Sequence, residues 1–156
     1  MAVSTWVNRA GMKGAIAIKV LKRENGMVIL RFDTGEAFPE ALGEWCQNEN
    51  LQSAAILCGI GMLRSIEIGL YDGTEYTRRT ITDPSEVLSL QGSVSMKEGK
   101  PFVHLHTSVA GHDFSAMGGH LFSAEVYMTI ELVLMEFTPG LVRKPVGGAF
   151  WQMDVK

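Results

Sequence analysis

Segments with β-strand periodicity, separated by short turn signals, recur along most of this chain, and they constrain its fold more than any other feature. About eight such segments can be distinguished, the last as one bent strand or two: 15–21, 27–33, 53–57, 62–71, 76–83, 86–96, 102–108 and 121–137. Turn signals such as Asn25-Gly26 and Asp72-Gly73 lie between them. Because short turns join antiparallel neighbours, the pattern predicts a mostly antiparallel sheet, and so many twisted strands are expected to curl.

The segment 36–48 has the periodicity of a helix instead. Its apolar stripe consists of Ala37, Phe38, Ala41, Leu42 and Trp45. Pro39 is compatible with the first turn of a helix, where its missing N–H costs nothing. The expected fold class is therefore α+β, with a mostly antiparallel curled β-sheet and one main helix at about 36–48.

Length and composition indicate one folded unit. The chain has 156 residues, of which 46% are hydrophobic and 20% charged, which fits one domain over 1–156 and excludes a disordered chain. The sequence has neither a secretory leader pattern nor an apolar run of the ~20 residues that cross a membrane. We therefore expect a cytoplasmic protein. Cys46 and Cys58 are expected to be small buried thiols.

Charge and motifs point away from nucleotide and nucleic-acid binding. Lys and Arg number 14 against 17 Asp and Glu, a net charge of −3, which leaves no electrostatic footprint for DNA. Gly59 and Gly61 lack the third glycine and the helix start of a dinucleotide fingerprint. The sequence also contains no phosphate-binding loop, no serine-hydrolase elbow, no HExxH and no cysteine-based zinc motif.

Three of the four histidines lie close together and form the main candidate site. His104 and His106 occupy positions i and i+2 of a predicted strand, so both project from one face, ~6.6 Å apart along the strand. His120 follows Gly118 and Gly119, which let the backbone turn sharply or approach a neighbour closely. Three imidazoles with an open fourth position are typical of catalytic zinc, and imidazole also suits iron, nickel and copper. The alternative is three ordinary hydrogen-bonding histidines on a surface.

Four further residues are candidates for orienting a metal-binding ring or contacting a substrate. Glu131 lies in an apolar strand, where a buried unpaired carboxylate would be costly, and Glu86 opens another predicted strand. His112 lies beside an aspartate in a loop, and Arg64 follows a glycine-rich stretch from which it could face an anion. For each of the four, the alternative is a solvent-exposed side chain without a functional role.

Four motifs occur in a characteristic order: GIGMLRSIEIGLYD at 59–72, EVLSLQG at 86–92, HLH at 104–106 and GGHL at 118–121. Together they resemble the plants and prokaryotes conserved domain, called the PPC or PCC domain. The similarity covers about 27–137 and leaves an N-terminal and a C-terminal extension. The resemblance implies a compact α+β domain that assembles as a homotrimer.

The resemblance also implies a metal site and a DNA-binding label. Several prokaryotic members hold a metal, often zinc, through histidines that correspond to His104, His106 and His120. In plants the domain follows an AT-hook that binds A·T-rich DNA, so the family is labelled as predicted DNA-binding. This sequence has no Arg-Gly-Arg-Pro core of an AT-hook and no basic tail. It departs from the family pattern in the loop with His112 and Phe114 and in its Trp-containing C-terminal tail.

Three functions are therefore expected as alternatives. The first is a metal-binding homotrimeric protein with a DNA-binding or regulatory role. The histidine pattern also resembles acetolactate decarboxylase, a zinc lyase of related fold. This favours a second function, a metal-dependent, lyase-like enzyme on a small carboxylic or oxo acid. The third is a structural assembly module in which the histidines only stabilise the fold.

Overall fold

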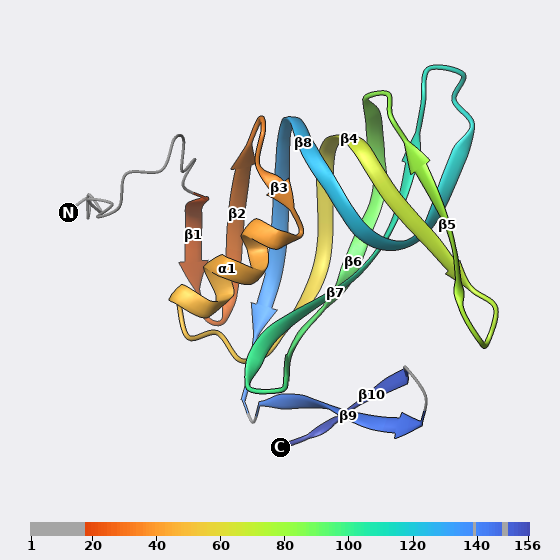
Figure 1. Cartoon of the computed structure of the whole chain (residues 1–156). Coiled ribbons are helices and arrows are strands. Elements are labelled where there is room, and N and C mark those ends of the chain that lie inside the picture. The colour runs from red at the N-terminus through yellow and green to blue at the C-terminus, as the bar shows by residue number, and fades with distance from the viewer. Residues whose placement is uncertain (1–17, 139, 148–149) are drawn as a thin grey trace, which may run out of the picture.

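The computed structural model describes residues 18–138, 140–147 and 150–156, and Figure 1 shows their arrangement. One helix, α1 (Glu40–Asn48), and ten strands occur in these ranges. The strands are β1 (Lys19–Glu24), β2 (Met27–Asp33), β3 (Ala37–Phe38), β4 (Ala54–Tyr71), β5 (Tyr76–Ile81), β6 (Ser85–Lys97), β7 (Lys100–Ala110), β8 (Ala116–Glu136), β9 (Leu141–Gly147) and β10 (Phe150–Val155). Among the described residues, no helix is long and apolar enough to cross a membrane. A sheet-dominated chain with one short helix agrees with the expected fold class.

All ten strands belong to one sheet, in the order β1-β2-β8-β4-β6-β9-β10. Strand β7 pairs with both β6 and β8, so β8, β4, β6 and β7 form a closed ring of pairings. Every pairing is antiparallel except a parallel contact between β6 and β9 at Met96 and Val142. The sheet curls, as expected, until β7 pairs with β8 and closes this ring. Figure 1 shows β4 and β8 bending across the molecule.

Two hairpin turns place consecutive residues at positive φ. Asn25 and Gly26 have φ of 52° and 80° and join β1 to β2. Glu98 and Gly99, with φ of 51° and 81°, join β6 to β7 in the same way. Paired positive φ values match the twist of the flanking strands, which is why Asn-Gly is a reliable hairpin signal.

The strands differ from the predicted ones in four places. Strand β8 begins at Ala116 and not at the predicted 121. Segments 53–57 and 62–71 form one strand, β4, because a register shift at Gly61, with φ of 132°, lets the strand continue through a bulge. The two-residue β3 and the hairpin of β9 and β10 were not predicted. Strand β9 contains Pro145, which weakens the sequence signal for a strand. The part of the predicted strand 15–21 before residue 18 lies outside the described residues.

The helix begins at Glu40, four residues later than the predicted start at 36. Residues 37–38 instead form β3, which pairs with β8. Pro39 explains the shift, since the residue before a proline is disfavoured in helical conformation, and Pro39 lies directly before the first helical residue. Leu42, Trp45 and Cys46 bury the apolar face of the helix.

The core lies on the inner side of the sheet, against α1. Alternate residues of β2 and β8 are fully buried there, and the largest fully buried side chains include Phe32, Phe38, Leu30, Leu42, Ile130, Leu132 and Leu134. Of the two thiols predicted to be buried, Cys46 is buried but Cys58 is exposed. A register shift between Ile56 and Cys58 interrupts the alternation of β4 and explains this difference. The opposite, outer face of the sheet carries the candidate site.

Gly92 allows the backbones of β6 and β7 to approach closely. Its substitution tests whether this close pairing contributes to the stability of the fold. A Cβ at Gly92 would lie 1.8 Å from the carbonyl oxygen of His104. We expect Gly92→Ala to lower the free energy of unfolding by ~1–3 kcal/mol, because the backbones must move apart. As a control, Gly43→Ala in α1 meets nothing closer than Val103 at 3.9 Å and should raise that free energy by ~0.5–1 kcal/mol. Urea denaturation measures both, and a Gly92→Ala chain as stable as the parent would contradict the expectation.

Candidate metal site

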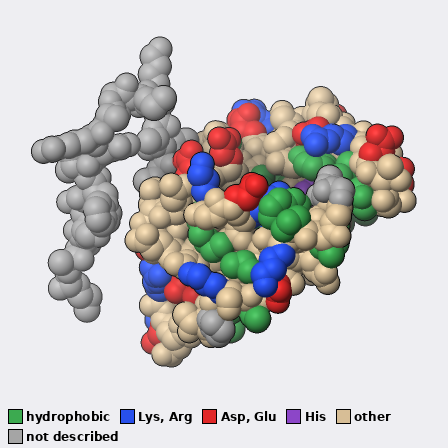
Figure 2. All heavy atoms as spheres, turned by 60° about the horizontal axis from the view of Figure 1, so that its bottom comes forward, with side chains coloured by type: hydrophobic (Ala, Val, Ile, Leu, Met, Phe, Trp, Pro, Cys, Tyr) green, Lys and Arg blue, Asp and Glu red, His purple; other side chains and the backbone are tan. Residues whose placement is uncertain are grey.

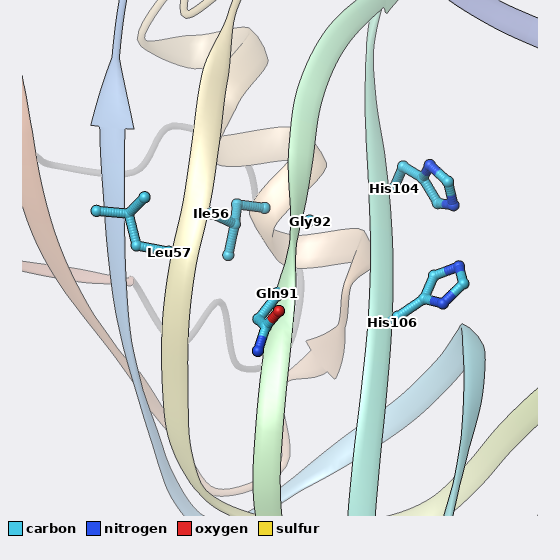
Figure 3. Close-up of a pocket in the computed structure, with 6 residues that line it drawn as sticks. All are labelled: Ile56, Leu57, Gln91, Gly92, His104 and His106. Carbon is cyan, nitrogen blue, oxygen red and sulfur yellow. The ribbon is translucent and has the colours of Figure 1, made fainter.

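Two neighbouring strands place the three histidines together. Strand β7 carries His104 and His106, and His120 on β8 pairs directly with His106. Directly paired residues of antiparallel strands share a face. The intervening Leu105 and the adjacent Leu121 are buried in the core, so the histidines project from the outer face. Figure 3 shows the rings of His104 and His106 leaving β7 on the same side.

The three rings lie within reach of one ion. Ring centroids are 5.2 Å apart for His104 and His106, 5.0 Å for His104 and His120, and 5.6 Å for His106 and His120. One nitrogen from each ring lies within 4.8 Å of the other two. A tetrahedral zinc at ~2.0–2.1 Å from each nitrogen needs the nitrogens ~3.4 Å apart. Small side-chain rotations therefore suffice, and this group could hold a metal.

The chemistry of the group also fits a divalent metal. Nδ1 of His120 is buried and has no hydrogen-bond partner among the described residues, which is costly for a polar atom. Burial lowers the pKa of His104 to about 4, and the nearby Arg143 and the other two rings contribute. Burial also lowers the pKa of His120, with the charge of His106 as the next cause. Neutral imidazole is the form that binds a metal.

Glycines bring the strands close enough to place His120. A Cβ on Gly119 would lie 2.6 Å from the carbonyl oxygen of Gly69, and one on Gly118 would lie 2.6 Å from that of Thr107. Both glycines lie within β8. Of the two roles predicted for them, the structure therefore shows close approach and not a sharp turn.

Two aromatic side chains, Phe122 and Tyr76, lie next to the ring of His120. Its ring centroid is 4.6 Å from that of Phe122 and 5.3 Å from that of Tyr76. The guanidinium of Arg78 lies 3.8 Å from the Phe122 centroid and pairs with Glu67 at 3.0 Å. These contacts restrict the ring of His120. Sequence reasoning missed Tyr76 and Phe122, although Phe122 follows His120 at i+2 and therefore shares its face of the strand.

Arg143 of β9 reaches the site from the C-terminal hairpin. Its Nη2 lies 3.0 Å from Nδ1 of His104 and 3.3 Å from Oγ of Ser93. Its Nε donates to Oγ of Ser95 at 3.1 Å, and its Nη1 to the carbonyl oxygen of Trp151 at 3.4 Å. None of the ion pairs among the described residues includes Arg143. No local pattern indicates this contact, because 39 residues separate Arg143 from His104.

An open hollow of about 510 Å³ adjoins the histidines. Its lining residues are Ile56, Leu57, Gln91, Gly92, His104 and His106 (Figure 3). Gln91 pairs with His106 across β6 and β7, and Ser93 pairs with His104. Polar groups therefore line one side of the hollow, and the exposed aliphatic side chain of Leu57 on β4 lies at the other. This volume accommodates a small molecule next to an ion on the histidines.

The four other candidates lie elsewhere. Glu131, Glu86 and His112 are exposed and do not belong to the histidine group. Arg64 forms an ion pair with Glu125. The structure thus brings together the three predicted metal ligands without these four residues.

The lowered pKa of His104 predicts how the stability of the metal-free protein depends on pH. In the unfolded chain this ring binds a proton near its ordinary pKa of 6.5, whereas in the fold it does so only at about 4. Because the unfolded state holds more protons between these values, stability should fall as pH drops from about 6.5 to 4 and be unaffected by this group above 6.5. Urea titrations at several pH values should show a smaller decline for His104→Gln, while the exposed-loop control His112→Gln keeps the parental decline. If stability declines as steeply in His104→Gln as in the parent, protonation of His104 is not the cause of the decline.

A curled sheet with a closed ring of pairings, one short helix packed against its inner face and three convergent histidines on its outer face define a small α+β protein with a potential metal site. The chain belongs to the Plants and Prokaryotes Conserved (PCC) domain family, whose family model matches residues 22–138. This confirms the resemblance noted in the sequence motifs and extends it at both ends.

Solved structures show the same fold. A plant- and prokaryote-conserved protein from Pyrococcus horikoshii is 29% identical, with a TM-score of 0.74 over 93% of this chain and 99% of its own. A metal-containing protein from Archaeoglobus fulgidus is 38% identical, with a TM-score of 0.69 over 81% and 87%. A presumed DNA-binding protein from Bacteroides thetaiotaomicron is 24% identical, with a TM-score of 0.76 over 82% and 90%, and shows the fold alone. No curated protein matches the chain.

Proposed function

We propose that this chain is a metal-binding protein that holds one divalent ion, zinc, through His104, His106 and His120. The observation that carries the proposal is the convergence of the three rings, with one nitrogen of each within 4.8 Å of the others. The lowered pKa values of His104 and His120 support it, since they keep both rings neutral. The relationship to the metal-containing A. fulgidus protein, at 38% identity, supports it further.

Replacing the ligands tests the proposal. His104→Ala, His106→Ala and His120→Ala should each weaken zinc binding by ~100-fold or more, because each removes one of three protein ligands. His112→Ala is the matched control, since His112 is an exposed histidine outside the group. Elemental analysis of the purified protein identifies the metal, and equilibrium dialysis gives its affinity. One tightly held zinc per chain in His104→Ala would show that the site is wrongly assigned.

A second candidate function is a metal-dependent, lyase-like enzyme acting on a small carboxylic or oxo acid. Three protein ligands leave a coordination position open, which is the arrangement of catalytic zinc. The hollow beside His104 and His106 gives a substrate access to that position. When bound, the metal would act as a Lewis acid toward a carbonyl or carboxylate oxygen. The exposed side chain of Leu57 at the edge of the hollow suits the carbon skeleton of such an acid.

The charge distribution does not favour a DNA-binding role, although the name of the B. thetaiotaomicron protein presumes one. Neutralisation of phosphates by Lys and Arg supplies most non-specific affinity for DNA, and this chain has a net charge of −3. Figure 2 shows basic side chains interspersed with acidic ones on the face turned to the viewer. That face therefore offers no continuous basic stripe for a duplex.

The proposed assembly is a homotrimer, as the family resemblance implies. Large exposed apolar side chains of the central strands β4 and β6 fit a role in self-association, among them Ile60 and Leu88, which are 60% and 55% exposed. Light scattering should give three times the chain mass of 17.1 kDa. The same measurement on His104→Ala shows whether assembly needs the metal. A monomer mass for the parent chain at micromolar concentration would exclude the trimer.

A further inference from the structure

We infer that Arg143 makes the histidine site a receptor for the carboxylate of a small aliphatic acid, held between the guanidinium and the metal. This inference rests on the proposed metal site and names the class of ligand that the site takes. Arg143 lies at position 143, beyond the 22–138 segment that the family model matches. It is therefore a feature of the C-terminal tail of this chain.

The contact between Arg143 and His104 fixes the tautomer of the ring when no metal is present. A guanidinium donates hydrogen bonds and accepts none. At 3.0 Å from Nη2, Nδ1 of His104 must therefore be the acceptor. The neutral ring then carries its proton on Nε2.

A metal on His104 is incompatible with this contact, whichever nitrogen binds it. If Nδ1 binds the metal, its lone pair is no longer available to the guanidinium. If Nε2 binds the metal, the ring proton moves to Nδ1, and two donors face each other. In both cases the Nη2 group of Arg143 loses an acceptor.

The remaining contacts keep the guanidinium beside the metal position. Ser93, Ser95 and the carbonyl of Trp151 still accept from it, and the guanidinium lies 5.4 Å from the ring centroid of Phe102. A divalent ion and a guanidinium then lie next to each other, and no ion pair among the described residues neutralises Arg143. A bound anion would accept the freed N–H and relieve the repulsion, and carboxylate matches the planar guanidinium.

The hollow indicates which kind of anion fits. Its polar side carries His104, His106 and Gln91, whereas the exposed Leu57 is the aliphatic side chain at its other edge; Ile56 is buried in the core. A carboxylate whose apolar body extends toward Leu57 would use both edges of the hollow. Inorganic phosphate would leave the aliphatic side without a partner.

Cobalt-loaded full-length protein tests this inference, because the visible spectrum of Co²⁺ reports a new ligand without any turnover. Titration with butyrate should change the spectrum and saturate, whereas neutral butyramide should not, and inorganic phosphate should bind more weakly. Arg143→Gln should weaken butyrate binding by roughly 10- to 100-fold while keeping the cobalt, and Arg143→Lys should restore part of the affinity. Lys144→Gln is the matched control, since Lys144 lies on the same strand but pairs with Asp154, and it should bind butyrate as the parent does.

Each other outcome is decisive. Equal butyrate affinity in the parent and Arg143→Gln, or no butyrate binding to cobalt-loaded parent, would overturn the role of Arg143 and leave the metal site intact. Phosphate binding tighter than butyrate would overturn the ligand class. Loss of cobalt from Arg143→Gln would overturn the inference, because the contact of Arg143 with His104 is expected to break, and not to help, when the metal binds. A parent chain that binds no cobalt would overturn the proposed metal site and, with it, this inference.

Discussion

The pairing of β7 with both β6 and β8 is the interaction on which the rest of the structure depends. It closes the ring of strands, and it places His120 directly opposite His106. The pairing is tight, because Gly92 leaves room for the carbonyl of His104 and Gly118 for that of Thr107. Side chains at these glycines would push the strands apart and separate the histidines, so the closure of the sheet and the geometry of the site have the same cause.

The same closure sets the chemistry of the site. Residues on the inner side of β7 and β8, such as Leu105 and Leu121, fill the core. The histidines next to them in sequence therefore lie together on the outer face. Tyr76 and Phe122 cover His120, and burial there disfavours a charged ring. Because the pKa values of His104 and His120 are lowered and the ring of His120 is restricted, part of the electrostatic and entropic cost of binding a metal is met in advance.

Sequence patterns predicted the parts of this molecule that depend on local spacing. The side-by-side placement of His104 and His106 follows from the two-residue period of a strand. The turn between β1 and β2 follows from Asn25-Gly26, since this pair favours consecutive positive φ values. The predicted start of the helix was wrong, because Pro39 and the pairing of β3 with β8 outweigh the apolar stripe at that end. The exposure of Cys58 depends on a bulge in β4 that no composition rule reveals. Arg143 was out of reach for a different reason, since only the folding back of the C-terminal hairpin brings it to His104.

That long-range contact couples the tail to the site. Arg143 and a metal compete for His104, so the free energy of metal binding includes the loss of this hydrogen bond. The hairpin also holds its place through Met96 and Val142, and through Lys97, whose ammonium lies 4.4 Å from the Trp151 ring centroid. Because these contacts do not involve the histidines, the hairpin can stay docked while the guanidinium changes partner. The strand pairings on which the three histidines depend lie within the segment matched by the family model, whereas Arg143 lies beyond it.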